Sequence, residues 1–528
     1  MSENIILTGF MGSGKDSVAK EISKKTDLAF ISMDDYIVLK EKRTINDIFE
    51  ESGEEYFRKA ETETLEVIKN LKNVVVATGG GIVKDKKNRE KLSKMGKVFY
   101  LYTSLDAVKE RLDNDKTRPL IKDKKNIIKI YNERMKKGIY EFADEKIDTS
   151  KIPPEQVADK ILKISKIEPK TEEESPDLYK LKADSKEYPI YIGCDIFKNN
   201  KDLDITLNSD KVAIISNPVV GALYIREIEK MLTDKGIKTL CCIIPDGEKY
   251  KNFDTIKKIF ETLLKEKMDR SSGIIALGGG VIGDMGGFVA STLKRGVSLI
   301  QIPTTLIAQV DSSIGGKTGF DHPLGKNMIG TFYQPDMILI DIKKLLTLPD
   351  KEFRNGMAEV IKYGITHDAE LFDILERKQK EIMKRDIMLL KDIISRCVRI
   401  KKEVVEEDEK EEKGIREVLN YGHTIGHIIE TLTGYSKYSH GEAVAIGMVE
   451  EAKLARKESN LATRDFDRVE KLIKKYDLPS SIPDNIQRED MKDCVSQDKK
   501  VRKGKIRLPV PTEIGKTIFR EVECEKFL

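Results

Sequence analysis

The chain has 528 residues, of which 39% are hydrophobic and 35% are charged. At roughly 150 residues per domain, this length predicts about three domains. The 94 basic and 90 acidic residues leave a formal net charge of only +4, which argues against a nucleic-acid-binding protein. Periodic apolar segments exclude a disordered chain, and no apolar run reaches the ~18 residues of a membrane span.

The sequence predicts a cytoplasmic location. Residues 1–10 have neither the basic region nor the cleavage site of a secretory signal. The six cysteines are scattered without CxxC spacing, which predicts reduced thiols and neither a disulfide framework nor a zinc knot. All five histidines lie at position 322 or later, so any histidine-ligated metal is expected in the second part of the chain.

Short apolar runs alternate with helical patterns over residues 1–165. The apolar runs are residues 5–7, 74–76 and 98–101, and residues 17–25 have a helical pattern. This alternation predicts an α/β domain, with a parallel sheet covered by helices. The polar segment 166–176, which contains two prolines, is predicted to be a linker.

The remainder of the chain divides again near residue 345. Strand-like runs dominate up to about residue 341, at 189–192, 212–215, 273–277, 299–302 and 337–340. Beyond them the pattern is mostly helical, with long charged segments such as residues 377–407. We therefore expect an α/β nucleotide-binding domain over residues 177–344 and an α-helical domain over residues 345–528.

A glycine-rich turn follows the first predicted strand. The segment Gly9-Phe-Met-Gly-Ser-Gly-Lys15 lies between this strand and a helix, which is the pattern of a phosphate-binding loop. Its backbone N–H groups would surround phosphate oxygens at the positive end of the helix, and Lys15 would reach the outer phosphates.

Further motifs in this part resemble shikimate kinase, over residues 1–165. They are Asp34 after the second apolar run, Arg58 and Glu61 on one helix, three glycines after a strand, Arg111, and Arg118-Pro-Leu. The resemblance implies phosphorylation of the 3-hydroxyl of shikimate by ATP with Mg²⁺. It implies nucleotide contacts from Gly12, Ser13, Gly14, Lys15, Asp16, Ser17, Arg111 and Arg118, and shikimate contacts from Asp34, Arg58, Glu61, Gly79, Gly80, Gly81 and Arg134. The catalytic residues implied are Lys15, Asp34 and Arg118, the last in a lid.

This part departs from the family pattern at three places. Asp16 stands where the family has Ser or Thr, and Ser32 stands where it usually has Asp. We interpret the pair as an exchange that keeps one carboxylate and one hydroxyl at the magnesium site. The second carboxylate-binding arginine of the family falls at Lys136, and we favour Arg134 half a turn away. The alternative is a weak or inactive nucleotide-binding module with a regulatory role.

The second part contains a histidine cluster. His423 and His427 share one face of a predicted helix, and His440 lies in a nearby turn. The opposite face is apolar, so the histidines are expected to point away from the core. It carries Ile425, Ile428, Ile429 and Leu432. The spacing alone predicts both helix histidines as zinc ligands.

Two turns in this part have groups suited to a nucleotide. Gly278-Gly-Gly-Val-Ile-Gly283 follows a strand and begins a helix, and Asp246-Gly-Glu248 with Lys251 offers partners for ribose hydroxyls and phosphate.

Long motifs from about residue 178 to the end resemble 3-dehydroquinate synthase. They include residues 278–292, 295–320, 323–327, 356–364, 419–427 and 440–444. The resemblance implies that Glu359, His423 and His440 hold zinc and that His427 contacts substrate instead. It implies conversion of DAHP, a seven-carbon keto acid phosphate, to 3-dehydroquinate and phosphate, with NAD regenerated in each turnover.

The same resemblance implies the other site residues. NAD contacts are implied for Asp246, Glu248, Lys251, Gly279, Gly280, Val281, Asp284, Thr304, Thr305, Asp311, Lys317 and Lys326. DAHP contacts are implied for Arg295, Lys317, Asn327, Lys362, Lys401, Arg416, Asn420, His427 and Lys499. Catalytic roles are implied for Asp311, Lys317, Lys362, Lys401, Arg416, Asn420 and His427. Arg295 would reach the site of a neighbouring subunit, which implies a homodimer.

Two small departures, Asp321 and one additional residue within 408–414, are interpreted as loop variation. Alternatives for this part are another sugar-phosphate cyclase or a zinc polyol dehydrogenase of similar fold. Cobalt or iron would also suit a Glu/His/His ligand set. The overall prediction is a bifunctional enzyme that acts on small-molecule substrates and binds neither nucleic acid nor membrane.

Overall fold

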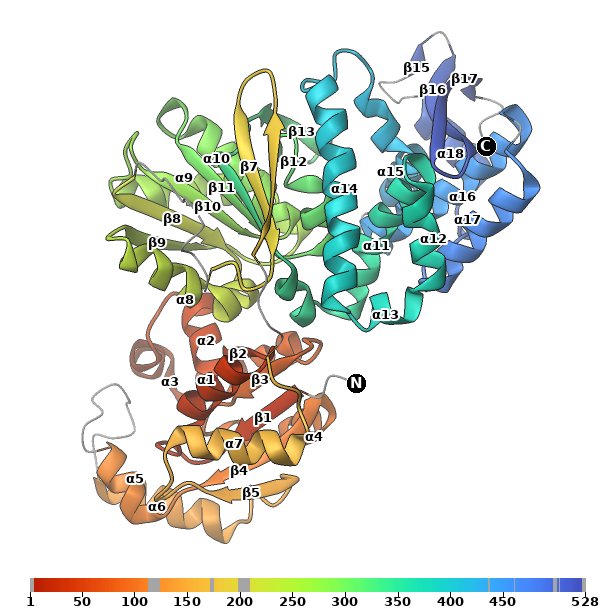
Figure 1. The fold of residues 1–528 in the computed structure, drawn as a ribbon. Helices are drawn as coiled ribbons and strands as arrows, with labels where there is room; N and C mark the ends of the chain where they lie inside the picture. Colours follow the sequence, from red (N-terminus) through yellow and green to blue (C-terminus); the bar gives the residue numbers. More distant parts are fainter. Residues whose placement is uncertain are drawn as a thin grey trace.

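The computed structural model describes residues 4–112, 124–170, 175–197, 209–434, 437–459, 461–496, 501–502 and 504–524. Figure 1 shows three successive parts. A first α/β part, in red and orange, lies below a second α/β part in yellow and green, and a mostly helical part in blue lies beside the second (Figure 1). The expected α/β architecture is confirmed.

The first part is built on a five-stranded parallel sheet of order β2-β3-β1-β4-β5. Every residue of β1 and β3 is buried, because helices cover both faces of the sheet. This burial explains the continuous apolar runs of their sequences. The strands are β1 (Asn4–Thr8), β2 (Ala29–Ser32), β3 (Val74–Ala77), β4 (Gly96–Tyr102) and β5 (Glu145–Asp148).

Seven α-helices of the described residues belong to this part. Side chains cap the starts of α2, α3 and α4: Ser32 accepts from Asp35 N, Thr44 forms a capping box with Asp47, and Asp85 accepts from Lys87 N. The helices are α1 (Lys15–Lys25), α2 (Met33–Glu41), α3 (Ile45–Ile68), α4 (Lys86–Met95), α5 (Leu105–Leu112), α6 (Lys124–Lys136) and α7 (Pro154–Ser165).

The second part has a seven-stranded sheet of order β6-β7-β14-β11-β10-β8-β9. The edge pair β6–β7 is antiparallel and the other pairs are parallel. Its strands are β6 (Asp177–Lys182), β7 (Glu187–Gly193), β8 (Lys211–Ser216), β9 (Lys238–Ile243), β10 (Gly273–Gly278), β11 (Ser298–Pro303) and β14 (Met337–Asp341). Its helices are α8 (Pro218–Asp234), α9 (Phe253–Lys265) and α10 (Gly280–Thr292), and a separate hairpin is formed by β12 (Lys317–His322) and β13 (Gly325–Phe332).

The third part is helical, with one small sheet that the sequence analysis did not predict. The helices are α11 (Asp350–Thr366), α12 (Ala369–Arg377), α13 (Gln379–Met383), α14 (Ile387–Glu407), α15 (His423–Leu432), α16 (His440–Glu458), α17 (Thr463–Lys475) and α18 (Arg488–Ser496). The expected helical segment 377–407 is therefore interrupted twice. The antiparallel sheet comprises β15 (Val501–Arg502), β16 (Lys505–Glu513) and β17 (Lys516–Glu523).

The first and second parts are in contact, because α8 packs against α2 and β2. Polar contacts add to this packing: Asn73 Nδ2 donates to the Leu346 carbonyl at 2.8 Å, and Lys343 Nζ lies 2.7 Å from Asp27 Oδ1. Among the described residues, none of the helices has the length and apolarity needed to cross a membrane.

Candidate functional sites

The phosphate-binding loop lies between β1 and α1, as predicted. Gly12 and Gly14 have φ values of 77° and 83°, a left-handed conformation that favours glycine. Lys15 Nζ donates to the Gly9 and Phe10 carbonyls, each at 3.1 Å, so its ammonium group lies against the loop. Ser13 is buried, and Asp16 and Ser17 follow in the first turn of α1. The loop thus presents a helix N-terminus and a lysine at one place.

Arg111 joins this loop from α5. Its Nη1 donates to the Gly12 carbonyl at 3.2 Å and its Nη2 to the Thr149 carbonyl at 2.5 Å. The structure therefore places Arg111 at the loop. The predicted lid residue Arg118 lies outside the described residues.

The predicted shikimate residues converge beside this loop. A Cβ atom on Gly79 would collide with Glu61 Oε1 and come within 3.2 Å of Asp34 Oδ1. A Cβ on Gly81 would collide with Arg58 Nη1, so these glycines are required by close approach of the two side chains. Arg58 Nη1 lies 2.7 Å from Glu61 Oε2.

Arg134 belongs to the same group and Lys136 does not. Arg134 is buried, and its Nη1 donates to the Gly80 carbonyl at 2.5 Å while its guanidinium lies over the Phe10 ring. Lys136 is exposed. The site therefore has two arginines, one on α3 and one on α6, next to two carboxylates.

The carboxylates of this site interact electrostatically. The pKa of Glu61 is raised to about 7: burial is the main cause, Arg58 opposes it, and the charge of Asp34 adds a smaller upward effect. Burial also raises the pKa of Asp35, and the charges of Asp16 and Asp34 add to that effect. Asp16, Asp34 and Asp35 therefore lie close enough to interact, beside the Ser32 hydroxyl that caps α2.

The second site contains a group that could hold a metal ion. Glu359 on α11, His423 at the start of α15 and His440 at the start of α16 offer ligand atoms that lie within 4.8 Å of one another. Glu359 Oε1 is 3.4 Å from His423 Nε2 and 3.5 Å from His440 Nε2. One carboxylate and two imidazoles at this spacing fit a catalytic zinc ion with positions left open for substrate.

The prediction that the histidines point away from the core is wrong for one of them. His423 is buried against Glu359, whereas His427, one turn later, is exposed. The imidazole rings of His423 and His427 are 5.6 Å apart between centroids. The supposed apolar face is also not uniform, because Leu432 is 36% exposed.

Buried ion pairs surround this group. Lys362 Nζ lies 2.5 Å from Glu359 Oε2, and Lys401 pairs with Asp311, which also accepts a hydrogen bond from Tyr363. Burial raises the pKa of Asp311, but the charges of Lys401 and Lys362 outweigh it and hold the pKa below its ordinary value. The site is therefore preassembled with compensated charges.

Arg416 provides a cation that the protein does not fully satisfy. It is 1% exposed, and its Nη1 donates to the Gly315 and Glu409 carbonyls. Within the described residues, its buried Nη2 has no hydrogen-bond partner. A buried guanidinium with an unused donor is suited to an anionic ligand. Asn420 lies at the other end of the same short 3-10 helix, Arg416–Asn420, and is half-buried.

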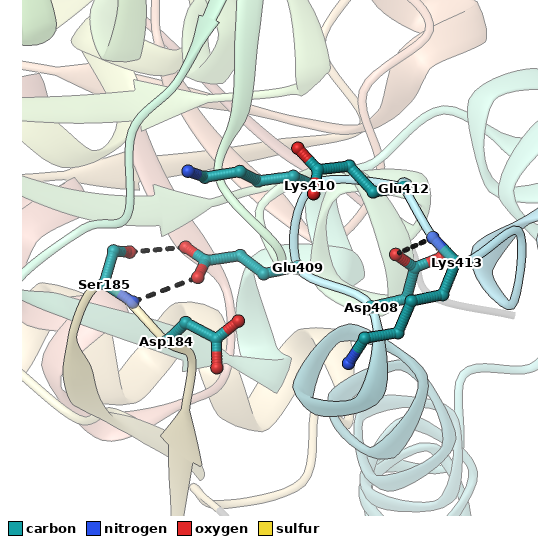
Figure 2. A pocket seen from close by; sticks show the side chains of 7 residues that line it. All are labelled: Asp184, Ser185, Asp408, Glu409, Lys410, Glu412 and Lys413. Carbon is teal, nitrogen blue, oxygen red and sulfur yellow. Dashed lines mark hydrogen bonds between the residues drawn. The ribbon is translucent and has the colours of Figure 1, made fainter.

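The loop with the additional residue reaches this site. Glu411 pairs with Lys317 on β12 and lies 3.6 Å from Arg416 Nε. Beside it is a hollow of about 250 Å³, whose lining Figure 2 shows. There Glu409 accepts hydrogen bonds from Ser185, and Asp408 accepts from the Lys413 amide (Figure 2). Both hydrogen bonds join residues of the lining to one another.

Several of the predicted dinucleotide residues follow the ends of strands β10 and β11 of the second sheet. The glycine turn links β10 to α10, and a Cβ on Gly279 or Gly280 would come within 3.2 Å of Thr305 or Ser312. Val281 and Asp284 follow in α10, and Thr304 follows β11. The carboxyl ends of these strands and the helix N-terminus thus form one edge, as nucleotide sites of this architecture do.

Lys251 contacts one residue predicted to bind NAD and one predicted to bind DAHP. Its Nζ lies 2.6 Å from Asp284 Oδ2 and 2.5 Å from Asn327 Oδ1. Asp321, interpreted as loop variation, accepts from the Asn327 amide at 2.8 Å and so helps to position that residue. Asp246 accepts from Asn217 Nδ2 at 2.8 Å.

The sequence analysis missed Glu430. This buried residue of α15 lies 3.5 Å from His440 Nδ1 and 3.1 Å from Lys326 Nζ, which is itself 3.7 Å from Glu248. Its position three residues after His427 is a signal in the sequence, since residues i and i+3 are neighbours on a helix surface. Arg295 is exposed, and Lys499 lies outside the described residues.

Comparison with known proteins assigns the two sites to two families. Residues 11–166 match the family model for shikimate kinase, and residues 241–355 and 356–501 match those for the N-terminal and C-terminal parts of 3-dehydroquinate synthase. The 3-dehydroquinate synthase of Thermodesulfovibrio yellowstonii is 52% identical over 308 residues, which cover 58% of this chain and 86% of that protein. The enzyme of Pelobacter propionicus is 46% identical over 320 residues, covering 61% and 89%.

A solved structure shows the same fold. The 2-epi-5-epi-valiolone synthase of Streptomyces hygroscopicus, with NAD⁺ and Zn²⁺ bound, matches with a TM-score of 0.59 and 27% identity, over 64% of this chain and 95% of that protein. The chain therefore belongs to the 3-dehydroquinate synthase family, and a shikimate kinase domain precedes its synthase part.

Proposed function

We propose that this bifunctional enzyme phosphorylates shikimate at the site in residues 1–165 and converts DAHP to 3-dehydroquinate at the site in residues 177–528, with residues 166–176 as the linker. The observation that carries the synthase assignment is the Glu359, His423 and His440 group beside Lys362 and Arg416. For the kinase, it is the convergence of the phosphate loop with two arginines and two carboxylates.

In the kinase, Arg58 and Arg134 would bind the shikimate carboxylate, because both guanidinium groups border the glycines 79–81. Asp34 would accept the proton of the 3-hydroxyl while its oxygen forms the new bond to the γ-phosphorus and the bond to ADP breaks. Lys15 would leave the Gly9 and Phe10 carbonyls for the transferred phosphate. Asp16 and the Ser32 hydroxyl would supply oxygen ligands for magnesium.

In the synthase, Glu359, His423 and His440 would hold the metal, and the edge formed by β10, α10 and Lys251 would hold NAD. When bound, zinc would polarise a substrate hydroxyl, and NAD would accept and return a hydride. Arg416, Lys362 and Lys401 would bind the anionic groups of DAHP, and His427 and Asn420 would contact substrate from α15 and the preceding turn. The exposed face of His427 accords with a substrate contact.

One assay separates this proposal from its alternatives. The purified protein, supplied with zinc, NAD and DAHP, is expected to release phosphate without net formation of NADH. Net NADH would indicate a polyol dehydrogenase, and no reaction with DAHP would indicate another sugar-phosphate cyclase. In the same preparation, ATP- and magnesium-dependent consumption of shikimate is expected; its absence would leave the first part as a nucleotide-binding module.

We also propose a homodimer in the cytoplasm. Arg295 is exposed, so it is available to another subunit. Apolar side chains are also exposed on the β12–β13 hairpin and at the start of α9: Leu324 is 88% exposed, Phe332 45% and Phe253 62%. Sedimentation is expected to give a dimer for the wild type and a monomer for Leu324→Lys with Phe332→Lys. The six free cysteines accord with a reducing location.

A further inference from the structure

Helix α8 of the synthase part packs against the kinase helix that carries Asp34. Val219, Ala222 and Leu223 of α8 lie against the apolar core of the kinase. In return, Ala29 and Leu39 of the kinase lie against a core cluster of the synthase. The two parts therefore share apolar packing at this contact, and helix α2 is held from both sides.

The contact is close at Gly221. A Cβ atom at this position would lie 3.4 Å from Leu39 Cδ1 and 3.1 Å from Ile225 Cδ1. The distance to Leu39 is at the short limit of ordinary van der Waals contact and the distance to Ile225 is tighter, so an added methyl group would require a neighbouring side chain to shift. Helix α2 thus has a defined position relative to α8.

One ion pair connects this contact to the kinase site. Arg226 Nη2 of α8 lies 2.6 Å from Asp35 Oδ2. Asp35 follows Asp34 directly in the first turn of α2, and the charges of Asp34 and Asp16 act on it. Arg226 is therefore the synthase-part cation at the edge of a group of three kinase carboxylates.

We propose that Arg226, in the synthase part, is a positioning residue of the shikimate kinase site. By holding Asp35 it orients the first turn of α2, and with it the Asp34 carboxylate that would contact the substrate hydroxyl. This inference rests on the proposed role of Asp34. It gives the fusion of the two enzymes a physical consequence, because one domain completes the geometry of the other.

The expected change in the KM for shikimate follows from the exposure of the two side chains of the ion pair. The side chains of Arg226 and Asp35 are 55% and 29% exposed, so solvent screens their attraction. We expect removal of the pair to raise the KM for shikimate by about two- to fivefold, the range that exposed ion pairs support. The KM for ATP and the synthase turnover depend on other groups and are expected to stay unchanged.

The test uses the full-length protein and a double-mutant cycle. Arg226→Ala and Asp35→Asn are each expected to raise the KM for shikimate, and the double variant is expected to resemble either single one. Arg226→Lys keeps the charge and is expected to recover most of the loss. Lys230→Glu, one turn further along the exposed surface of α8, is the matched control and is expected to have no effect.

An unchanged KM for shikimate in Arg226→Ala, or an equal change in Lys230→Glu, would overturn the inference. The inference would also be overturned if Arg226→Ala lowered kcat and synthase turnover and raised both KM values to a similar extent. Such a result would indicate a general structural role. Asp34→Asn, measured in parallel, distinguishes a failure of the proposed kinase site from a failure of the positioning role of Arg226. If Asp34→Asn retains kinase turnover, the proposed kinase site fails; if only the Arg226 variants are neutral, the positioning role fails alone.

Discussion

The two sites of this chain reach their charge balance in different ways. In the synthase site, Glu359 and Lys362 are each 1% exposed and pair with one another. In the kinase site, Lys15 lies on the carbonyls of its own loop, and the cluster of Asp16, Asp34 and Asp35 is half-buried. The synthase site is thus held assembled by internal ion pairs, whereas the kinase site has groups that must rearrange around phosphate and magnesium. Substitutions should therefore have severe effects in the synthase site and smaller effects in the kinase site.

The largest effect is expected from Glu359→Gln. The change removes a metal ligand and leaves Lys362 buried without its partner. Synthase turnover should fall by about 10³-fold or more, the scale of several kcal/mol of lost charge stabilisation. Zinc content after dialysis should fall too. Kinase turnover in the same sample is the control for folding, and a variant that keeps its zinc would contradict the ligand assignment.

The next largest effect is expected from Glu430→Ala. Glu430 contacts His440 Nδ1, which leaves Nε2 for the metal, and it also contacts Lys326. Loss of such a supporting carboxylate costs about 10- to 100-fold in metal affinity, measurable by competition with a chelator. Glu450→Ala on α16, whose partner is Lys453, is the matched control. Equal zinc affinity in the two variants would exclude the supporting role.

The pH dependence of the KM for DAHP should report the ionisation of the buried Lys401. The pKa of Lys401 is lowered to about 8, mainly by burial; Asp311 opposes this shift, and the charge of Arg416 contributes to it. The amine is charged below this value and neutral above it, so attraction for the anionic substrate is lost as the pH rises. The KM for DAHP should increase about tenfold per pH unit above about pH 8, and Lys401→Arg should remove the transition. A flat profile in the wild type would contradict the assignment.

A smaller effect is expected at the magnesium site of the kinase. Asp16→Ser removes the carboxylate and should lower kinase turnover several-fold, and the addition of Ser32→Asp should restore it. The readout is turnover as a function of magnesium concentration. If Asp16→Ser alone keeps full activity and Ser32→Asp adds nothing, the two positions do not compensate for one another.

Much of the architecture could be predicted from the sequence, because parallel strands buried on both faces have continuous apolar runs such as residues 74–76. The sheet β15–β17 was missed at the end of a region with a strong helical pattern. The contact between α8 and α2 was also unpredictable. Val219, Ala222 and Leu223 have the composition of any amphipathic helix, and only the fold shows what they contact.

The site residues also divide into those that the sequence could predict and those that it could not. Glycine spacing indicated the phosphate loop without reference to tertiary structure, because the loop is local. Helical spacing, in contrast, indicated His423 and His427 as equivalent, whereas Glu359 from α11 approaches only His423. The contacts of Glu430 depend on two distant elements, β13 and α16, so local spacing alone could not identify its partners.

The most direct test of two separately assembled sites in one chain is Asp34→Asn, with both activities measured in one preparation. Asparagine keeps the shape of the side chain but cannot accept the hydroxyl proton. We expect kinase turnover to fall by about 10²-fold or more, with phosphate release from DAHP unchanged. Retained kinase turnover, or a parallel loss of both activities, would contradict this account.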